Sequence, residues 1–119
     1  MEWGAQHAER WRWQCESLAD LGEFLREHAP GTALFLPPVP WRVGTERTVA
    51  ATLTEALVDP ELVPQYARVL GVPVRRETRA DHAVWRVTWR IGPTDPDTGM
   101  PRTRCVLAVR ITPPAVFSR

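Results

Sequence analysis

The sequence predicts an α+β domain in which an antiparallel sheet of three or four strands is packed on one face by two or three helices. Three observations support this fold class. Apolar residues recur at helical spacing before residue 71, they alternate with a period of two after it, and 119 residues suit a single domain over 1–119. The composition, 44% hydrophobic and 24% charged, is typical of a globular chain.

A long helix is expected over residues 5–28, because the helix breakers Pro30 and Gly31 follow it. One side of this helix carries apolar or small residues at helical spacing: Trp11, Cys15, Leu18, Gly22 and Leu25. We expect this side to cross the sheet. The expected contacts join Trp11 and Leu18 to Trp85, Trp89 and Leu107.

A second apolar patch on the same helix contains Trp13 and Phe24. At ~100° per residue these two lie roughly 200° and 220° around from Trp11, on the opposite side. If the first side faces the sheet, the second meets another element of the chain, a partner subunit or water. Trp is enriched at interface hot spots. We therefore expect Trp13 and Phe24 to bind a second copy or another protein.

The middle of the chain is expected to contain a short strand over residues 32–36, then a Pro-rich extended connector over 37–41. Gly44 and Thr45 offer a turn and an N-cap for a helix over 46–58, with Val49, Ala50, Leu53 and Leu57 on its apolar side.

A further helix is expected over residues 60–70, with Asp59 as its cap, Pro60 at the first position and Gly71 at its end. Residues 65–73 also match the first helix and turn of a degenerate helix-turn-helix, which would need a recognition helix from Val74 onward. The segment 72–79 fits an edge strand equally well, so both interpretations stay open.

Residues 72–112 predict a β-meander. Apolar and polar residues alternate over 84–91 and again over 104–112, and a loop rich in Pro, Gly and Asp joins these two strands into an antiparallel hairpin. Residues 72–78 add a third strand. A loose tail is expected over 113–119, after the last strand ends at Pro113.

The charge is divided unevenly between the two halves. Residues 1–71 contain six Arg and ten acidic residues, whereas residues 72–119 contain nine Arg and four acidic residues, and the chain has no Lys. Four of these Arg gather on the outer face of the hairpin: Arg86, Arg90, Arg104 and Arg110. Depending on register, Arg86 opposes Arg110 or Arg90 opposes Arg104, and like charges opposed across strands cost up to ~1 kcal/mol.

Acidic groups beside the face that carries these four Arg would relieve the repulsion between them. The acidic helices of a second copy, a nucleic-acid backbone, or Glu77 on a neighbouring strand could supply them. A solvated Arg and Thr face in a chain that lacks Lys is the alternative to all three.

No pattern for catalysis is found. His7, His28 and His82 are isolated, Cys15 and Cys105 belong to no CxxC motif, and no Gly-rich phosphate loop occurs. We therefore expect no catalytic residue, no metal site and no cofactor. The chain shows no signal-peptide pattern and no apolar segment long enough to span a bilayer, so the expectation is a cytoplasmic protein without a membrane partner.

These observations favour a non-enzymatic interaction module that self-associates, as a homodimer or other homo-oligomer, or docks a protein partner through Trp13, Phe24 and the Arg face. The alternative is a nucleic-acid-binding protein that uses the Arg face or the helix-turn-helix. The salt dependence of binding distinguishes these two functions, because phosphate contacts weaken steeply with ionic strength.

Overall fold

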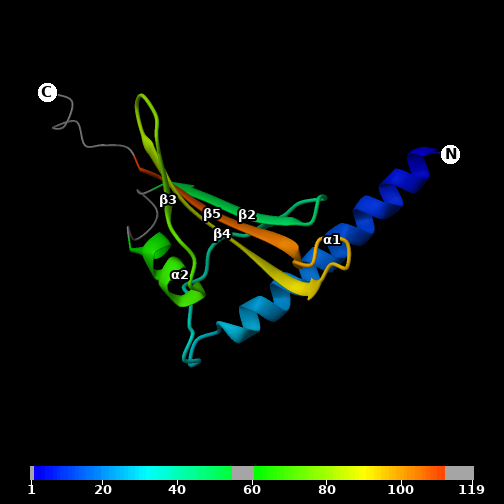
Figure 1. Ribbon diagram of the computed structural model, residues 1–119, viewed down its shortest axis with the longest axis horizontal. Helices are drawn as coiled ribbons and strands as arrows, with labels where there is room; N and C mark the ends of the chain where they lie inside the picture. Colours follow the sequence, from blue (N-terminus) through cyan, green and yellow to red (C-terminus); the bar gives the residue numbers. More distant parts are fainter. Residues whose placement is uncertain (1, 55–60, 112–119) are drawn as a thin grey trace, which may run out of the picture.

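The computed structural model of the protein describes residues 2–54 and 61–111, which form an α+β fold (Figure 1). The elements in chain order are α1 (Glu2–Glu27), β1 (Arg42–Val43), β2 (Thr48–Thr54), α2 (Leu62–Leu70), β3 (Arg75–Thr78), β4 (Ala83–Thr94) and β5 (Pro101–Ile111). The strand order across the sheet is β1-β2-β5-β4-β3. Neighbouring strands are antiparallel except β2 and β5, which are parallel. The predicted α+β class is confirmed, but the sheet is mixed and has five strands.

The prediction of a helix over 46–58 is wrong where the structure describes it, because residues 48–54 form β2; residues 55–58 lie outside the described residues. Val49, Ala51 and Leu53 alternate with threonines and Ala50 along this segment. Three Thr residues in seven positions favour an extended strand, since a β-branched side chain loses rotamer freedom in a helix. The helical spacing of Val49 and Leu53 is equally compatible with the period-two pattern of a strand.

The predicted strand over 32–36 is also wrong. Residues 30–34 form turns, and Leu36 returns to the end of α1 through a hydrogen bond from its N–H to the carbonyl oxygen of His28, at 3.1 Å. The predicted connector over 37–41 contains neither helix nor strand. It delivers Trp41 to the core, edge-on to Tyr66 and to Trp89 at ring-centroid distances of 6.4 and 5.7 Å.

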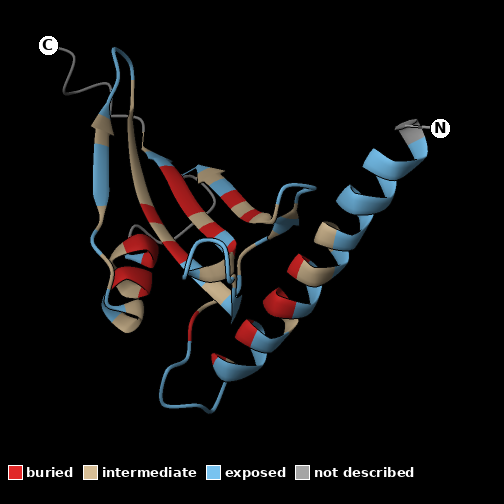
Figure 2. Ribbon diagram, turned by 45° about the vertical axis from the view of Figure 1, so that its right-hand side comes forward, coloured by how far each residue is buried: buried red, intermediate tan, exposed pale blue. Residues whose placement is uncertain are grey.

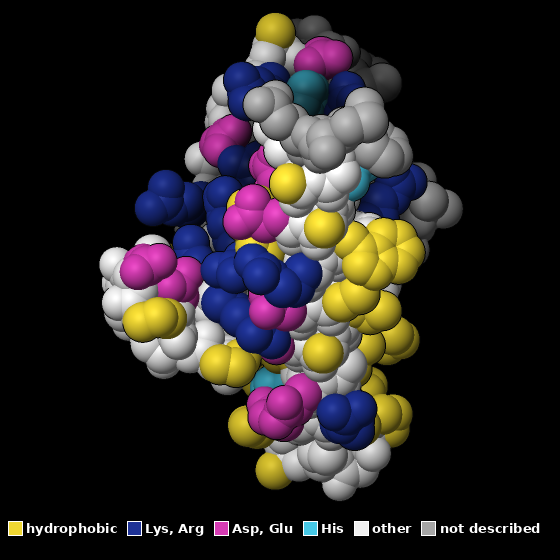
Figure 3. Space-filling model, turned by 90° about the vertical axis from the view of Figure 1, so that its right-hand side faces the viewer, with side chains coloured by type: hydrophobic (Ala, Val, Ile, Leu, Met, Phe, Trp, Pro, Cys, Tyr) yellow, Lys and Arg dark blue, Asp and Glu magenta, His cyan; other side chains and the backbone are white. Residues whose placement is uncertain are grey.

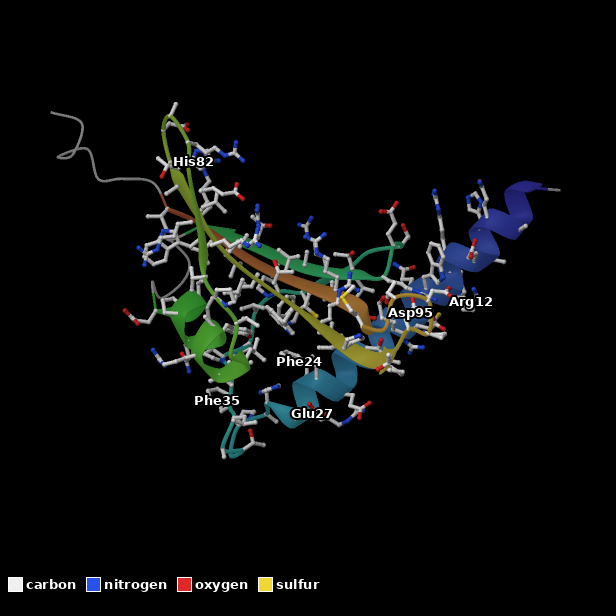
Figure 4. All side chains as sticks on the ribbon, viewed as in Figure 1. Arg12, Phe24, Glu27, Phe35, His82 and Asp95 are labelled. Atoms are coloured by element: carbon white, nitrogen blue, oxygen red, sulfur yellow. The ribbon has the colours of Figure 1, made fainter. Side chains whose placement is uncertain are left out.

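Both described helices cover the same face of the sheet, which we call the inner face (Figures 1 and 2). Phe24 of α1 points toward this face and lies 5.6 Å from Trp89, ring to ring (Figure 4). Tyr66 of α2 approaches the same Trp89 ring at 5.8 Å and donates a hydrogen bond to the carbonyl oxygen of Pro37 at 2.5 Å. Trp89 is thus the point where both helices and the connector meet.

The long N-terminal helix is confirmed, but the assignment of its two sides is wrong. Trp11 and Leu18 are 71% and 60% exposed, whereas Phe24 is 5% exposed and packs against Trp89. The buried side contains Ser17, Asp20, Leu21, Phe24 and His28. Three of these residues, Ser17, Asp20 and His28, are polar, so apolar spacing alone does not identify this side as the buried one.

The second described helix and the meander are confirmed, with α2 over 62–70 and strands at 75–78, 83–94 and 101–111. Gly71 ends α2 in the left-handed conformation, as expected for a helix C-cap. Because residues 75–78 pair with β4 as a strand, no recognition helix follows α2, and the helix-turn-helix hypothesis is wrong. The predicted tail over 113–119, and Asp59 and Pro60, lie outside the described residues.

Candidate interaction surfaces

The outward side of α1 carries a continuous apolar row that the described chain leaves uncovered. We call this row the seam; its members are Gly4, Ala8, Trp11, Cys15, Leu18, Gly22 and Leu25. Trp11, Leu18 and Leu25 are 71%, 60% and 43% exposed, Gly22 is half-buried, and the others are exposed. Figure 3 shows hydrophobic side chains in a line along this side of the helix. Exposed apolar rows of this length usually mark a contact surface.

A network of ion pairs fixes the opposite side of α1 on the sheet and so determines which side remains outside. Asp20 accepts hydrogen bonds from Arg102 Nε at 2.9 Å and Nη2 at 3.0 Å, and from Thr103 Oγ1 at 2.6 Å. The hydrogen bond to Asp20 raises the pKa of Arg102. Glu16 extends the network to Arg102 and Arg47, at 3.4 Å each. These polar contacts orient the helix, which explains why its more apolar side faces outward.

The seam continues past the end of α1 onto the following turn. Leu34 and Phe35 are 53% and 36% exposed. Phe35 and Leu25 line an apolar pocket of about 260 Å³ together with Phe24, His28 and Tyr66. The exposed apolar surface is therefore larger than the helix row alone.

The outer face of the sheet is the second candidate surface, and neither described helix covers it. Trp89 is opposite Cys105, so the register places Arg90 directly opposite Arg104, one of the two predicted alternatives. Arg75 is likewise opposite Arg86 across β3 and β4. Two like-charge pairs therefore lie on one face, which is unfavourable without an anion nearby.

Local carboxylates neutralise only part of this face. Glu77, one of the three acidic partners considered for this face, accepts a hydrogen bond from Arg86 Nη1 at 2.5 Å, and Asp81 lies 3.7 Å from Arg110. Arg90 donates to the carbonyl oxygen of Pro101 at 3.2 Å. Within residues 2–54 and 61–111, no carboxylate forms an ion pair with Arg90 or Arg104. A groove of about 440 Å³ opens beside Arg104, lined also by Arg75, Glu77, Arg86 and Thr88.

The structure separates the six residues predicted to bind a partner. Arg86, Arg90, Arg104 and Arg110 share the outer face, as expected, with Arg90, Arg104 and Arg110 exposed. Phe24 is buried in the core, and the Trp13 ring is covered by the Arg47 guanidinium at 5.3 Å from the ring centroid. The helix residues available to a partner are instead Trp11, Leu18 and Leu25. Their exposure could have been inferred only by pairing Asp20 with Arg102, and the two are 82 positions apart.

Two other kinds of site are absent from residues 2–54 and 61–111. Among the described residues, no group of three His, Cys, Asp or Glu side chains is placed to hold a metal ion. In the same part of the chain, no helix combines the length and apolar character needed to cross a membrane.

Comparison with known proteins gives no relative. No protein-family model matches the chain, and no curated protein or solved structure matches it.

Proposed function

We propose that the chain is a non-enzymatic protein-interaction module and that the seam of α1 is its contact surface. The observation that carries this proposal is the exposure of Trp11, Leu18 and Leu25 along one side of a helix that is anchored by its other side. Burying a large apolar side chain contributes about 1.5–3 kcal/mol. Three such side chains in one row offer a partner a substantial gain, and the helix is already formed, so little ordering entropy opposes binding.

Site-specific photo-cross-linking in cells that make the protein tests this proposal. A photoreactive amino acid at position 18 is expected to give a cross-linked adduct, because Leu18 lies in the middle of the seam. The matched control is the same amino acid at position 6, because Gln6 is exposed on the opposite side of α1. Adducts from both positions would indicate random collision, and an adduct from neither would contradict the proposal.

The outer face supports a second candidate function, the binding of a nucleic-acid backbone. The supporting observation is the pair Arg90 and Arg104, which oppose each other and form no ion pair with a carboxylate of the described residues. Phosphate groups would relieve this repulsion and would suit the planar guanidinium groups. Among the described residues, the strands place no aromatic side chain on the outer face to stack on single-stranded bases, because Trp85 and Trp89 lie on the inner face. This proposal therefore concerns a duplex.

Binding of a fluorescent DNA duplex, followed by anisotropy, tests the second candidate. If four Arg contact phosphates, the affinity is expected to fall about 100-fold between 50 and 200 mM salt. The variant Arg90→Glu with Arg104→Glu should lose this binding, whereas Arg10→Glu with Arg12→Glu, which makes the same charge change on α1, should keep most of it. Equal losses in both variants would show only a general effect of net charge.

A further inference from the structure

The seam has the spacing of a coiled coil. Its seven members follow one another by four and three residues in strict alternation, from Gly4 to Leu25. Apolar positions at this spacing form a straight row that packs against another helix, whose side chains fill the gaps between them. The row spans 22 residues, and the 21 steps between its ends cover ~32 Å of helix at 1.5 Å per residue. The geometry therefore favours a helix of similar length as the occupant.

We propose that this occupant is α1 of a second copy of the chain, packed antiparallel, with Leu18 of each copy against Cys15 of the other. This inference rests on the proposed function, because it names the partner of the same surface. Figure 2 shows exposed residues along the side of α1 that points away from the sheet, so a second copy can approach this side without meeting the sheet. The two sheets then lie on opposite sides of the helix pair.

The sizes of the seam residues support this register. Large residues (Trp11, Leu18, Leu25) alternate with small ones (Ala8, Cys15, Gly22) along the row. In the antiparallel register, every large residue meets a small one: Trp11 meets Gly22, Leu18 meets Cys15 and Leu25 meets Ala8. Two-fold symmetry repeats each contact, because the same surface serves both copies. Parallel packing would instead place like against like, with Trp11 on Trp11 and Gly22 on Gly22, and would leave gaps.

Gly22 has the space that this packing requires. A Cβ atom built on Gly22 would have only Arg26 Nη1 within 4 Å, at 3.7 Å. The Trp11 ring of the second copy would therefore rest on the bare helix backbone, next to the Arg26 guanidinium. A guanidinium against a Trp ring adds a favourable cation–π contact.

The charges beside the seam support the antiparallel direction as well. One flank carries the exposed residues Arg12 and Arg26, with the exposed residues Glu9 and Glu23 just behind them. In the antiparallel register this flank meets itself, so Arg12 lies near Glu23 of the second copy and Arg26 lies near Glu9. In a parallel pair it would meet the other flank, which carries no carboxylate (His7, Gln14, Leu21, His28). Opposite charges across the pair select the antiparallel direction.

Disulfide cross-linking of purified protein tests the register. We use two variants in a Cys15→Ala background, one with Ala8→Cys and the other with Leu25→Cys; Cys105 is fully buried and does not compete. A mixture of the two is expected to form a disulfide-linked dimer on mild oxidation, because the two cysteines face each other. Neither variant should cross-link efficiently alone. Cross-linking of each variant by itself would indicate a parallel pair and would overturn the inference.

Light scattering on Gly22→Leu provides a second readout that does not depend on cysteine chemistry. Filling the space for Trp11 is expected to raise the dimer dissociation constant at least ~10-fold. The melting temperature of the isolated fold should not fall, since Leu favours a helix more than Gly does. The control Gln6→Glu should dimerise like the wild type. A wild-type chain that stays monomeric at hundreds of micromolar overturns the inference; if position 18 still cross-links to a chain of different mass in cells, the proposed function stands without it.

Discussion

Replacing Asp20 by Ala is expected to lower the free energy of unfolding by about 3 kcal/mol. The Asp20 side chain is 5% exposed and accepts two hydrogen bonds from Arg102 and one from Thr103. Without it, the fully buried Thr103 hydroxyl loses its acceptor and Arg102 retains only Glu16, at 3.4 Å. Urea unfolding followed by Trp fluorescence measures the loss.

Two further variants make this prediction specific. Asp20→Asn keeps an oxygen that can accept from Thr103, so roughly half of the loss is expected. Glu23→Ala removes an exposed carboxylate from the same helix and should change the free energy of unfolding by less than ~0.5 kcal/mol. A loss below ~1 kcal/mol in Asp20→Ala would mean that the network does not anchor α1, and the argument for which side of the helix faces outward would fail with it.

The position of the Asp20 side chain also explains why residue 92 is a glycine. Gly92 lies in β4 with φ +91°, and a Cβ atom at this position would collide with the Asp20 carboxylate. A glycine is therefore required there both by the backbone conformation and by the close approach of α1. The sequence identifies Gly92 as part of a turn-rich loop, but only the structure shows that a helix residue 72 positions earlier occupies the space.

Elements with one strong periodic signal could be predicted from the sequence. The alternation in β4 and β5, and the helical spacing closed by Gly71 in α2, leave few alternatives. The segment that forms β2 has a weaker signal, since Val49 and Leu53 fit a helix and a strand alike. Its place beside β5 depends on a parallel pairing across more than 50 residues, and local spacing carries no information about such a contact.

The two sides of α1 show why periodicity alone did not locate the candidate site. Apolar spacing finds both Trp11 with Leu18 and Trp13 with Phe24, but it does not say which pair faces the sheet. The choice depends on Ser17 and Asp20, whose polarity suggests solvent although both are buried. A buried carboxylate is acceptable only with its partners, and here those partners come from β5. The four Arg of the outer face could be placed without knowledge of distant partners, because the alternation of apolar and polar residues along two strands is sufficient to assign them to one face.

Alkaline pH is expected to unfold the protein between about pH 9 and 12. Burial raises the pKa of Cys105 from 9.0 to about 12, with a smaller contribution from the charge of Asp20, and burial raises the pKa of Tyr66 from 10.0 to about 12. As pH rises, the unfolded chain loses these two protons before the folded chain does. The stability that depends on them is complete below pH 9 and is lost toward pH 12. At 1.36 kcal/mol per pH unit, the two groups together remove up to ~7 kcal/mol.

The chain is well suited to this measurement, because it contains one Tyr and no Lys, so no ammonium side chain titrates in the same window. Urea midpoints at pH 7, 9, 10 and 11 should decrease from pH 9 onward, and tyrosinate absorbance should rise only as the Trp fluorescence reports unfolding. In Cys105→Ala the decrease should begin near pH 10, since only Tyr66 then contributes. If tyrosinate appears near pH 10 while the chain is still folded, Tyr66 is open to water. The packing of α2 and the connector around Trp89 would then be looser than the ring contacts of Tyr66 indicate.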